Sequence, residues 1–158
     1  MIANGIFLSK LIYIIQVWGG CSDFLLDFLQ VQQNRAARYV TKLGRGTSVK
    51  TLLLQCGWLS VRQLATYHSL NLIYKTKRDK KPKYFYDKFT PEFAYQTRLA
   101  QGNSIRSNEK VTKTLTQQNF TFKSIKIWNE LPIDIRTESS ELKYKRKVKA
   151  WIKSNILI

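Results

Sequence analysis

Basic side chains are the residues of this chain whose types and spacing point to a chemistry, and that chemistry is anion binding. They form three groups: one with helical spacing, one closely set in mid-chain, and one near the C-terminus. The groups are Arg35, Arg38 and Lys42; Lys77, Arg78, Lys80, Lys81 and Lys83; and Lys143, Lys145, Arg146, Lys147, Lys149 and Lys153. Clustered lysine and arginine neutralise phosphates and release their counterions. We therefore take these residues as candidates for nucleic-acid contact.

Two of the groups have a second interpretation. The face formed by Arg35, Arg38 and Lys42 is also typical of a helix surface that faces solvent. The stretch 75–88 has seven basic and two acidic residues and includes Tyr84, Phe85 and Tyr86. These aromatic rings either stack on unpaired bases or pack back on the core beneath a solvated helix end. Both interpretations stay open at this point.

The acidic side chains give little support for catalysis. There are 10 acidic residues, and none is adjacent to another in the sequence. Asp23 and Asp27 have i, i+4 spacing, which suits charge balance at a helix start better than a metal site. The sequence has no G-x-S-x-G, phosphate-binding P-loop or G-x-G-x-x-G motif. We expect no catalytic residues, no metal and no cofactor in this chain, and we interpret the single histidine, His68, as a core or rim residue.

Composition predicts a folded protein with an acidic partner. The chain has 158 residues, 44% of them hydrophobic, and a net charge of +17. Residues 1–60 contain six basic and two acidic residues, whereas residues 61–158 contain 21 and eight. So large an imbalance repels itself on folding unless an acidic partner is near. RNA or DNA is the commonest such partner, and an anionic membrane surface is the next candidate.

Cysteine usage and hydropathy indicate an intracellular protein without a membrane span. Cys21 and Cys56 lie far apart and lack metal-ligand spacing, so we interpret both as reduced thiols. The apolar run from Leu11 to Trp18 is well short of the ~20 residues that cross a bilayer. It also lacks the basic start of a signal peptide.

The N-terminal pattern predicts a series of helices. Residues 2–18 are almost continuously apolar and predict a buried helix that ends at Gly19 and Gly20. Ser22 is expected to cap a second helix that runs to about Leu43, before Gly44 and Gly46. Its predicted apolar face is Leu25, Leu29, Gln32, Ala36, Tyr39 and Val40.

Two more helices should follow. A short one is expected over residues 48–56, ended by Gly57. Ser60 and Gln63 match a capping box at the start of a helix that runs to about Lys77. Its predicted apolar face is Val61, Leu64, Ala65, His68 and Leu72.

The remainder is predicted to be a basic loop followed by helices. Residues 90–114 read as a mobile loop, with one short strand at about 113–117. Pro132 ends an aromatic-rich segment whose Trp128 we expect to be a structural anchor. Ser139 or Ser140 then caps a basic helix with Tyr144, Val148, Trp151 and Ile152 on its apolar face. The fold class predicted is mainly α, a helical bundle with at most a short β element.

Three blocks, in order, resemble one family. They are Ser9–Tyr13 with Val17–Gly19, then Leu29–Arg38 followed by Gly57–Leu59, then Phe120 to Pro132 followed by Lys145–Lys149. At this spacing they are similar to the region downstream of the polymerase core in non-LTR retrotransposon reverse transcriptases of the jockey or CR1 type. The resemblance covers nearly the whole chain.

The resemblance implies a thumb-like helical segment over residues 1–89 and a basic C-terminal region over residues 90–158. It implies template RNA and target DNA as partners, and a nuclear location. The family's catalytic motif, an aromatic residue followed by alanine and two aspartates, is absent. We therefore expect a nucleic-acid-binding C-terminal fragment of an RNA-directed DNA polymerase that lacks the catalytic core. The alternatives are a scaffold module that docks on the missing polymerase core, and a membrane-surface role for residues 139–153.

Overall fold

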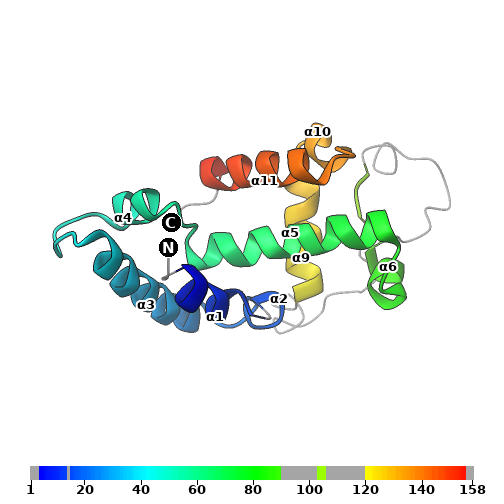
Figure 1. The fold of residues 1–158 in the computed structure, drawn as a ribbon. Coiled ribbons are helices and arrows are strands. Elements are labelled where there is room, and N and C mark those ends of the chain that lie inside the picture. The colour runs from blue at the N-terminus through cyan, green and yellow to red at the C-terminus, as the bar shows by residue number, and fades with distance from the viewer. Residues whose placement is uncertain (1–3, 14, 90–102, 106–119, 156–158) are drawn as a thin grey trace. The chain divides into compact units, whose positions relative to one another are not determined.

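The computed structural model describes residues 4–13, 15–89, 103–105 and 120–155, and it is mainly helical, as the sequence predicts (Figure 1). The predicted loop and strand within 90–119 lie outside the described residues, apart from 103–105. The chain divides into two compact units, Met1–Ala65 with Ile152–Ile158, and Thr66–Trp151. Helix α5 (Val61–Asp79) and helix α11 (Glu141–Asn155) each contribute to both units. This division follows packing, whereas the segments 1–89 and 90–158 follow from the family resemblance and stay a prediction.

The first unit begins with short helical pieces and not with one buried helix. A π-helical turn η1 (Asn4–Leu8) leads into α1 (Ser9–Ile12), and α2 (Ile15–Trp18) follows after a break. Leu11 and Ile15 are buried, but Ile6, Tyr13 and Val17 are exposed, so the prediction of a buried helix over residues 2–18 is wrong. The apolar run thus has more apolar side chains than the rest of the described structure covers.

A glycine ends this opening segment, as the sequence predicts. A Cβ atom on Gly19 would lie 2.5 Å from the carbonyl oxygen of Ile15 and 2.8 Å from Cβ of Ala65. Only glycine fits so close an approach without a shift of the backbone. The turn after α2 therefore depends on this residue.

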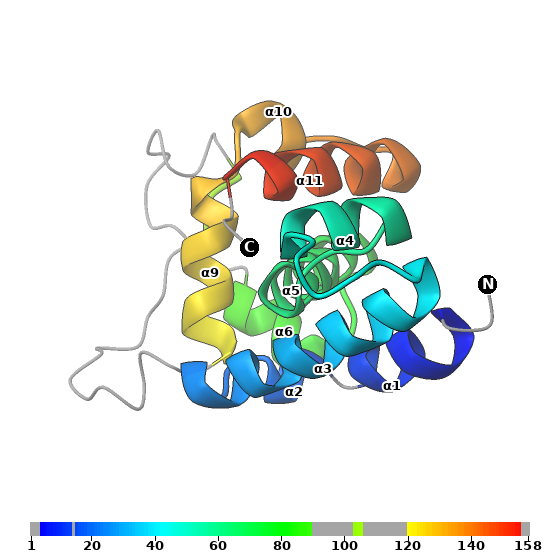
Figure 2. The ribbon, with the colours of Figure 1, turned by 90° about the vertical axis from the view of Figure 1, so that its left-hand side faces the viewer.

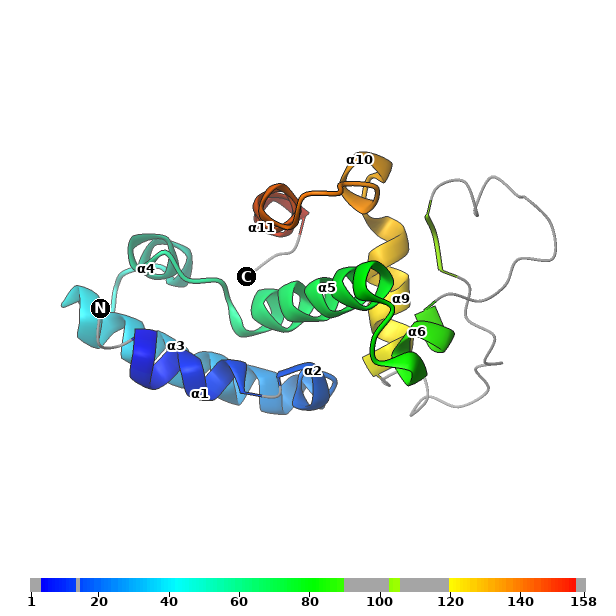
Figure 3. The ribbon, with the colours of Figure 1, turned by 45° about the vertical axis from the view of Figure 1, so that its right-hand side comes forward.

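Helices α3 (Asp23–Thr41) and α4 (Val49–Cys56) also belong to the first unit, and α1 lies along α3 (Figure 2, Figure 3). Ser48 caps α4 by accepting a hydrogen bond from the Thr51 backbone N–H at 3.2 Å, and Gly57 ends α4 in the left-handed region. Ala37, Leu52, Leu53 and Trp58 form a buried cluster between α3, α4 and the segment after α4. Both predicted ends of α4 are confirmed.

Helix α3 differs from its prediction in register and in its end. The buried residues are Leu26, Gln33 and Ala37, whereas Tyr39 is 87% exposed. Gln33 Nε2 donates to the carbonyl oxygen of Leu59 at 2.8 Å, so a polar side chain occupies the inner face. The helix ends at Thr41 with Lys42 in the left-handed region, before the predicted glycines.

The capping box at the start of α5 is confirmed. The Ser60 backbone N–H donates to Gln63 Oε1 at 3.1 Å, and the Gln63 backbone N–H donates to Ser60 Oγ at 3.2 Å. A third bond runs from the Val61 backbone N–H to Gln30 Oε1 on α3 at 2.9 Å. The first-turn amides of Val61 and Gln63 are thus paired, and α3 is fixed against the start of α5. On the predicted apolar face Val61, Leu64 and Ala65 are buried, whereas His68 and Leu72 are only half-buried.

The second unit joins the rest of α5 to α6 (Lys83–Phe89), α9 (Phe120–Glu130), α10 (Ile133–Arg136) and α11 up to Trp151. Helix α11 runs alongside α5, and α9 crosses their direction (Figure 1, Figure 2). The rings of Tyr74 and Tyr144 stack with centroids 3.9 Å apart, and Tyr144 Oη donates to the Leu70 carbonyl oxygen at 3.0 Å. These contacts fix α11 on α5.

Candidate nucleic-acid interface

Helix α11 presents its free cations on the side opposite its buried face. Tyr144, Val148 and Ile152 are fully buried, which confirms the predicted apolar face, and Trp151 is half-buried beside them. The predicted residues Lys143, Arg146, Lys149 and Lys153 are all exposed. In the described part of the chain, no ion pair or hydrogen bond holds their charged ends. With i, i+3, i+6 and i+10 spacing they share one face of the helix. We call these four residues the cationic row.

The other two predicted residues of α11 are already paired within the protein. Lys145 Nζ lies 2.5 Å from Glu141 Oε1, and Lys147 Nζ lies 2.8 Å from Glu138 Oε2. Hydrogen bonds from Lys145 and then from Arg78 lower the pKa of Glu141 to about 2. The bond to Glu138 raises the pKa of Lys147. These two lysines flank the cationic row, and ion pairs within the protein partly neutralise their charge.

The mid-chain group lies on the same unit as the row up to Lys149. Arg78 Nη1 at the end of α5 lies 2.5 Å from Glu141 Oε2 on α11, so the two helices are joined by an ion pair. Arg78 also pairs with Asp79 at 2.6 Å, and both carboxylates raise its pKa. Lys80, Lys81 and Lys83 follow and are exposed. The structure thus brings the predicted second and third groups to neighbouring helices.

The first predicted group belongs to the first compact unit. Arg35 is exposed and its Nη1 is 3.4 Å from Gln32 Oε1, and Lys42 is exposed at the end of α3. Arg38 is half-buried, and its Nε lacks a hydrogen-bond partner within the described structure. This group is therefore not one uniform solvated face.

Several residues near the candidate interface were not predicted to have a role. Lys75 Nζ lies 3.7 Å from Glu141 Oε1, which makes three cations around one carboxylate. Arg136, the last residue of α10, is buried although its side chain is charged.

The aromatic residues after α5, the histidine and the two thiols differ in how far the protein covers them. Phe85 stacks on Phe89 with centroids 5.8 Å apart, whereas Tyr84 is 64% exposed. Burial lowers the pKa of His68, whose ring meets Tyr67 edge-on. Cys21 and Cys56 are free and half-buried.

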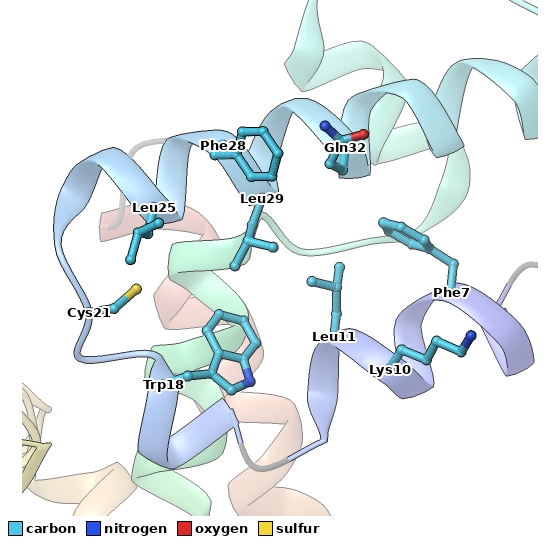
Figure 4. Close-up of a pocket in the computed structure, with 9 residues that line it drawn as sticks. All are labelled: Phe7, Lys10, Leu11, Trp18, Cys21, Leu25, Phe28, Leu29 and Gln32. Carbon is cyan, nitrogen blue, oxygen red and sulfur yellow. The ribbon is translucent and has the colours of Figure 1, made fainter.

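The first unit also contains an apolar pocket of about 570 Å³. Leu11 and Trp18 face Leu25 and Leu29 of α3 across it (Figure 4). Its lining is almost wholly carbon, with Lys10 and Gln32 as its polar members. Of the residues predicted for the inner face of α3, Leu25, Leu29 and Gln32 thus line this opening and Tyr39 and Val40 are exposed. Ala36 packs against the buried cluster around Ala37.

No family model, no curated protein and no solved structure matches this chain. The resemblance to non-LTR reverse transcriptases therefore stays a prediction. Across the residues described, no helix combines the length and hydropathy needed to cross a membrane.

Proposed function

We propose that this chain binds nucleic acid through the cationic row of α11, supplemented by the exposed lysines after α5. Following the sequence resemblance, we propose that it does so as a C-terminal region of a non-LTR RNA-directed DNA polymerase, without catalysis of its own. RNA or DNA is the partner in this proposal. The observation that carries it is the contrast on α11 between four cations with free charged ends and two that are paired.

The physical argument rests on where the charge is available. Four cations on one helix face repel one another and are stabilised by phosphates that approach from outside. The stack of Tyr144 on Tyr74 and the hydrogen bond from Tyr144 to the Leu70 carbonyl hold α11 on α5. The cationic row is therefore presented without further ordering of the backbone. A rigid row of this kind recognises the phosphate backbone and not base sequence.

A matched pair of double variants tests the proposal. Arg146→Gln with Lys149→Gln removes two free cations. Lys145→Gln with Lys147→Gln removes two paired cations, so both double variants lose the same net charge. We expect the first to reduce the slope of log affinity against log salt by about 1.5–2 units for single-stranded or duplex probes. The second should change the slope by less than half as much. Fluorescence anisotropy across a salt series, with RNA and DNA of one sequence, measures both.

Equal slopes for the two double variants would remove the cationic row from this role. All four side chains are exposed or half-buried, so we expect both variants to fold. Circular dichroism checks this. Absence of binding by the parent chain to either RNA or DNA would overturn the function itself.

The apolar pocket favours a second candidate, a docking module for the polymerase core of the parent protein. Exposed Phe24, Phe28 and Val31 have i, i+4, i+7 spacing on α3, close to the pocket residues Leu25 and Leu29. Such a face is typical of helix-in-groove contacts. Adding the chain to a polymerase core that lacks this region should restore activity, and Phe28→Ser should abolish the restoration. Restoration without nucleic-acid binding by the isolated chain would favour this candidate over the first.

A further inference from the structure

Two cations converge on one turn in the second unit without a carboxylate. Arg136 is only 8% exposed, and its Nη1 donates to Ser104 Oγ. Lys77 Nζ donates to the carbonyl oxygen of Asn103 at 3.3 Å and to Asn103 Oδ1. Among the described residues, no acidic side chain lies within ion-pair distance of either cation. All of their described side-chain hydrogen bonds go to neutral oxygens.

The turn that holds them is itself fixed. Trp128 Nε1 donates to the Asn103 carbonyl oxygen at 2.9 Å, and Lys77 Nζ lies 5.4 Å from the centre of the Trp128 ring. Asn103 Nδ2 donates to the Arg136 carbonyl oxygen at 2.8 Å. The two side chains are therefore preorganised at one place and are not free to separate.

This arrangement is costly for the protein alone. Arg136 is buried and Lys77 is half-buried. Without a counter-charge, such cations lose hydration that neutral oxygens only partly replace. Burial, and then the charge of Arg136, lower the pKa of Lys77 to about 8. Arg136 Nε, moreover, is buried and has no hydrogen-bond partner among the described residues. A buried donor left unpaired in a native protein calls for an explanation, and a bound anion is one partner that would satisfy it.

We propose that Lys77 and Arg136 form a binding site for a phosphate monoester, presented by the phosphorylated end of a nucleic-acid strand or by a free mononucleotide. A monoester has up to two negative charges and three acceptor oxygens, which match two cations with donors to spare. An internal phosphodiester has one charge and leaves one cation unbalanced. For a strand end as the ligand, this proposal rests on the proposed function, because it is the cationic row that brings nucleic-acid strands to this unit.

The first test compares probes. Oligonucleotides of one sequence with a 5′-phosphate or a 5′-hydroxyl, and AMP as the free source, are titrated against the full chain by calorimetry. We expect the 5′-phosphate to raise affinity about tenfold or more, as a charge-assisted hydrogen bond does. AMP binding without an end preference would assign the site to free mononucleotides. No end preference together with no AMP binding would overturn the proposal.

The second test compares variants. Lys77→Met keeps the alkyl chain against Trp128 and removes the charge, so we expect a folded protein without the end preference and without AMP binding. Arg136→Lys keeps a charge but removes the fork of donors, and should weaken the preference several-fold. Lys145→Gln is the control, because its cation is paired with Glu141 and lies outside the turn. A full end preference in Lys77→Met would overturn the site.

The two proposals fail in different ways. Arg146→Gln with Lys149→Gln should weaken strand binding and leave AMP binding unchanged. Wild-type protein that binds AMP but no strand contradicts the proposed function and supports the site. Strand binding with no monoester preference and no AMP binding contradicts the site and leaves the proposed function standing.

Discussion

Helices α3 and α11 both have an apolar repeat and a basic face in their sequences, yet only α11 buries its repeat. Tyr144, Val148 and Ile152 are each 0% exposed on α11. On α3, Leu25 and Val40 are nearly half exposed, and Tyr39 is 87% exposed. Gln33 and Ala37 are instead fully buried. The same kind of pattern thus gives opposite outcomes in two helices of one chain.

The difference comes from the polar groups that each helix must satisfy. Beside α3, the Leu59 carbonyl and the Val61 N–H need partners at the start of α5, and Gln33 and Gln30 supply them. Leaving such buried groups unpaired costs about 1–3 kcal/mol each, comparable to burying an additional apolar side chain. Beside α11, the Leu70 carbonyl accepts a hydrogen bond from the hydroxyl of an apolar-face residue, Tyr144. Hydrophobicity and hydrogen bonding therefore agree on α11 and compete on α3.

The largest effect should come from truncating a tyrosine on each helix. We expect Tyr144→Ala to lower the free energy of unfolding by about 3–5 kcal/mol, because a fully buried ring, its stack on Tyr74 and a hydrogen bond are lost. Tyr39→Ala should change it by less than about 0.5 kcal/mol, because the ring is exposed. Urea denaturation followed by circular dichroism measures both. Similar losses in the two variants would contradict the register of α3.

The second effect tests the polar inner face directly. Gln33→Leu makes α3 more apolar, yet we expect it to destabilise the protein by about 1–3 kcal/mol because the Leu59 carbonyl loses its donor. Gln32→Leu is the matched control on the neighbouring position, where the side chain lines the pocket and accepts only a long bond from Arg35. The control should be neutral to within about 0.5 kcal/mol. A stabilising Gln33→Leu would show that hydrophobicity alone sets the register.

The sequence predicts the structure well where the signals are local. The ends of α4, the capping box of α5 and the apolar face of α11 depend on residues within one or two turns of each other. The Trp128 anchor is also confirmed, since it is 1% exposed. In each of these features, one local sequence pattern meets both the hydrogen-bonding needs of the backbone and the packing needs of the core.

The failures depend on partners distant in sequence. Gln33 bonds a residue 26 positions away, and Arg78 pairs with Glu141 63 positions away. The i, i+4 pair of Glu141 and Lys145 is readable from spacing, but its link to α5 is not. Charge counts likewise do not show which lysines are paired and which are free. Arg136 was missed for the same reason, because its described side-chain partner, Ser104, lies 32 positions away.

The smallest expected effect on stability comes from the acidic residues near the N-terminal ends of α3 and α11. On α3, Asp23 and Asp27 share one cation, Arg62, at 3.1 and 2.6 Å, whereas on α11 Glu141 is surrounded by three. The pKa of Glu141 is lowered from 4.5 to about 2, so its stabilisation is present above pH 4.5 and is lost as the pH falls toward 2.

We therefore expect Glu141→Gln to be less stable than the parent near neutral pH, with the difference shrinking steadily between pH 4.5 and about 2 as the parent's carboxylate is protonated. Urea midpoints across this range measure it. Asp27→Asn is the control on α3, and as an exposed pair it should change stability at neutral pH by less than about 1 kcal/mol. A Glu141→Gln difference that stays constant down to about pH 2 would show that its ion pairs do not link α11 to α5 in solution.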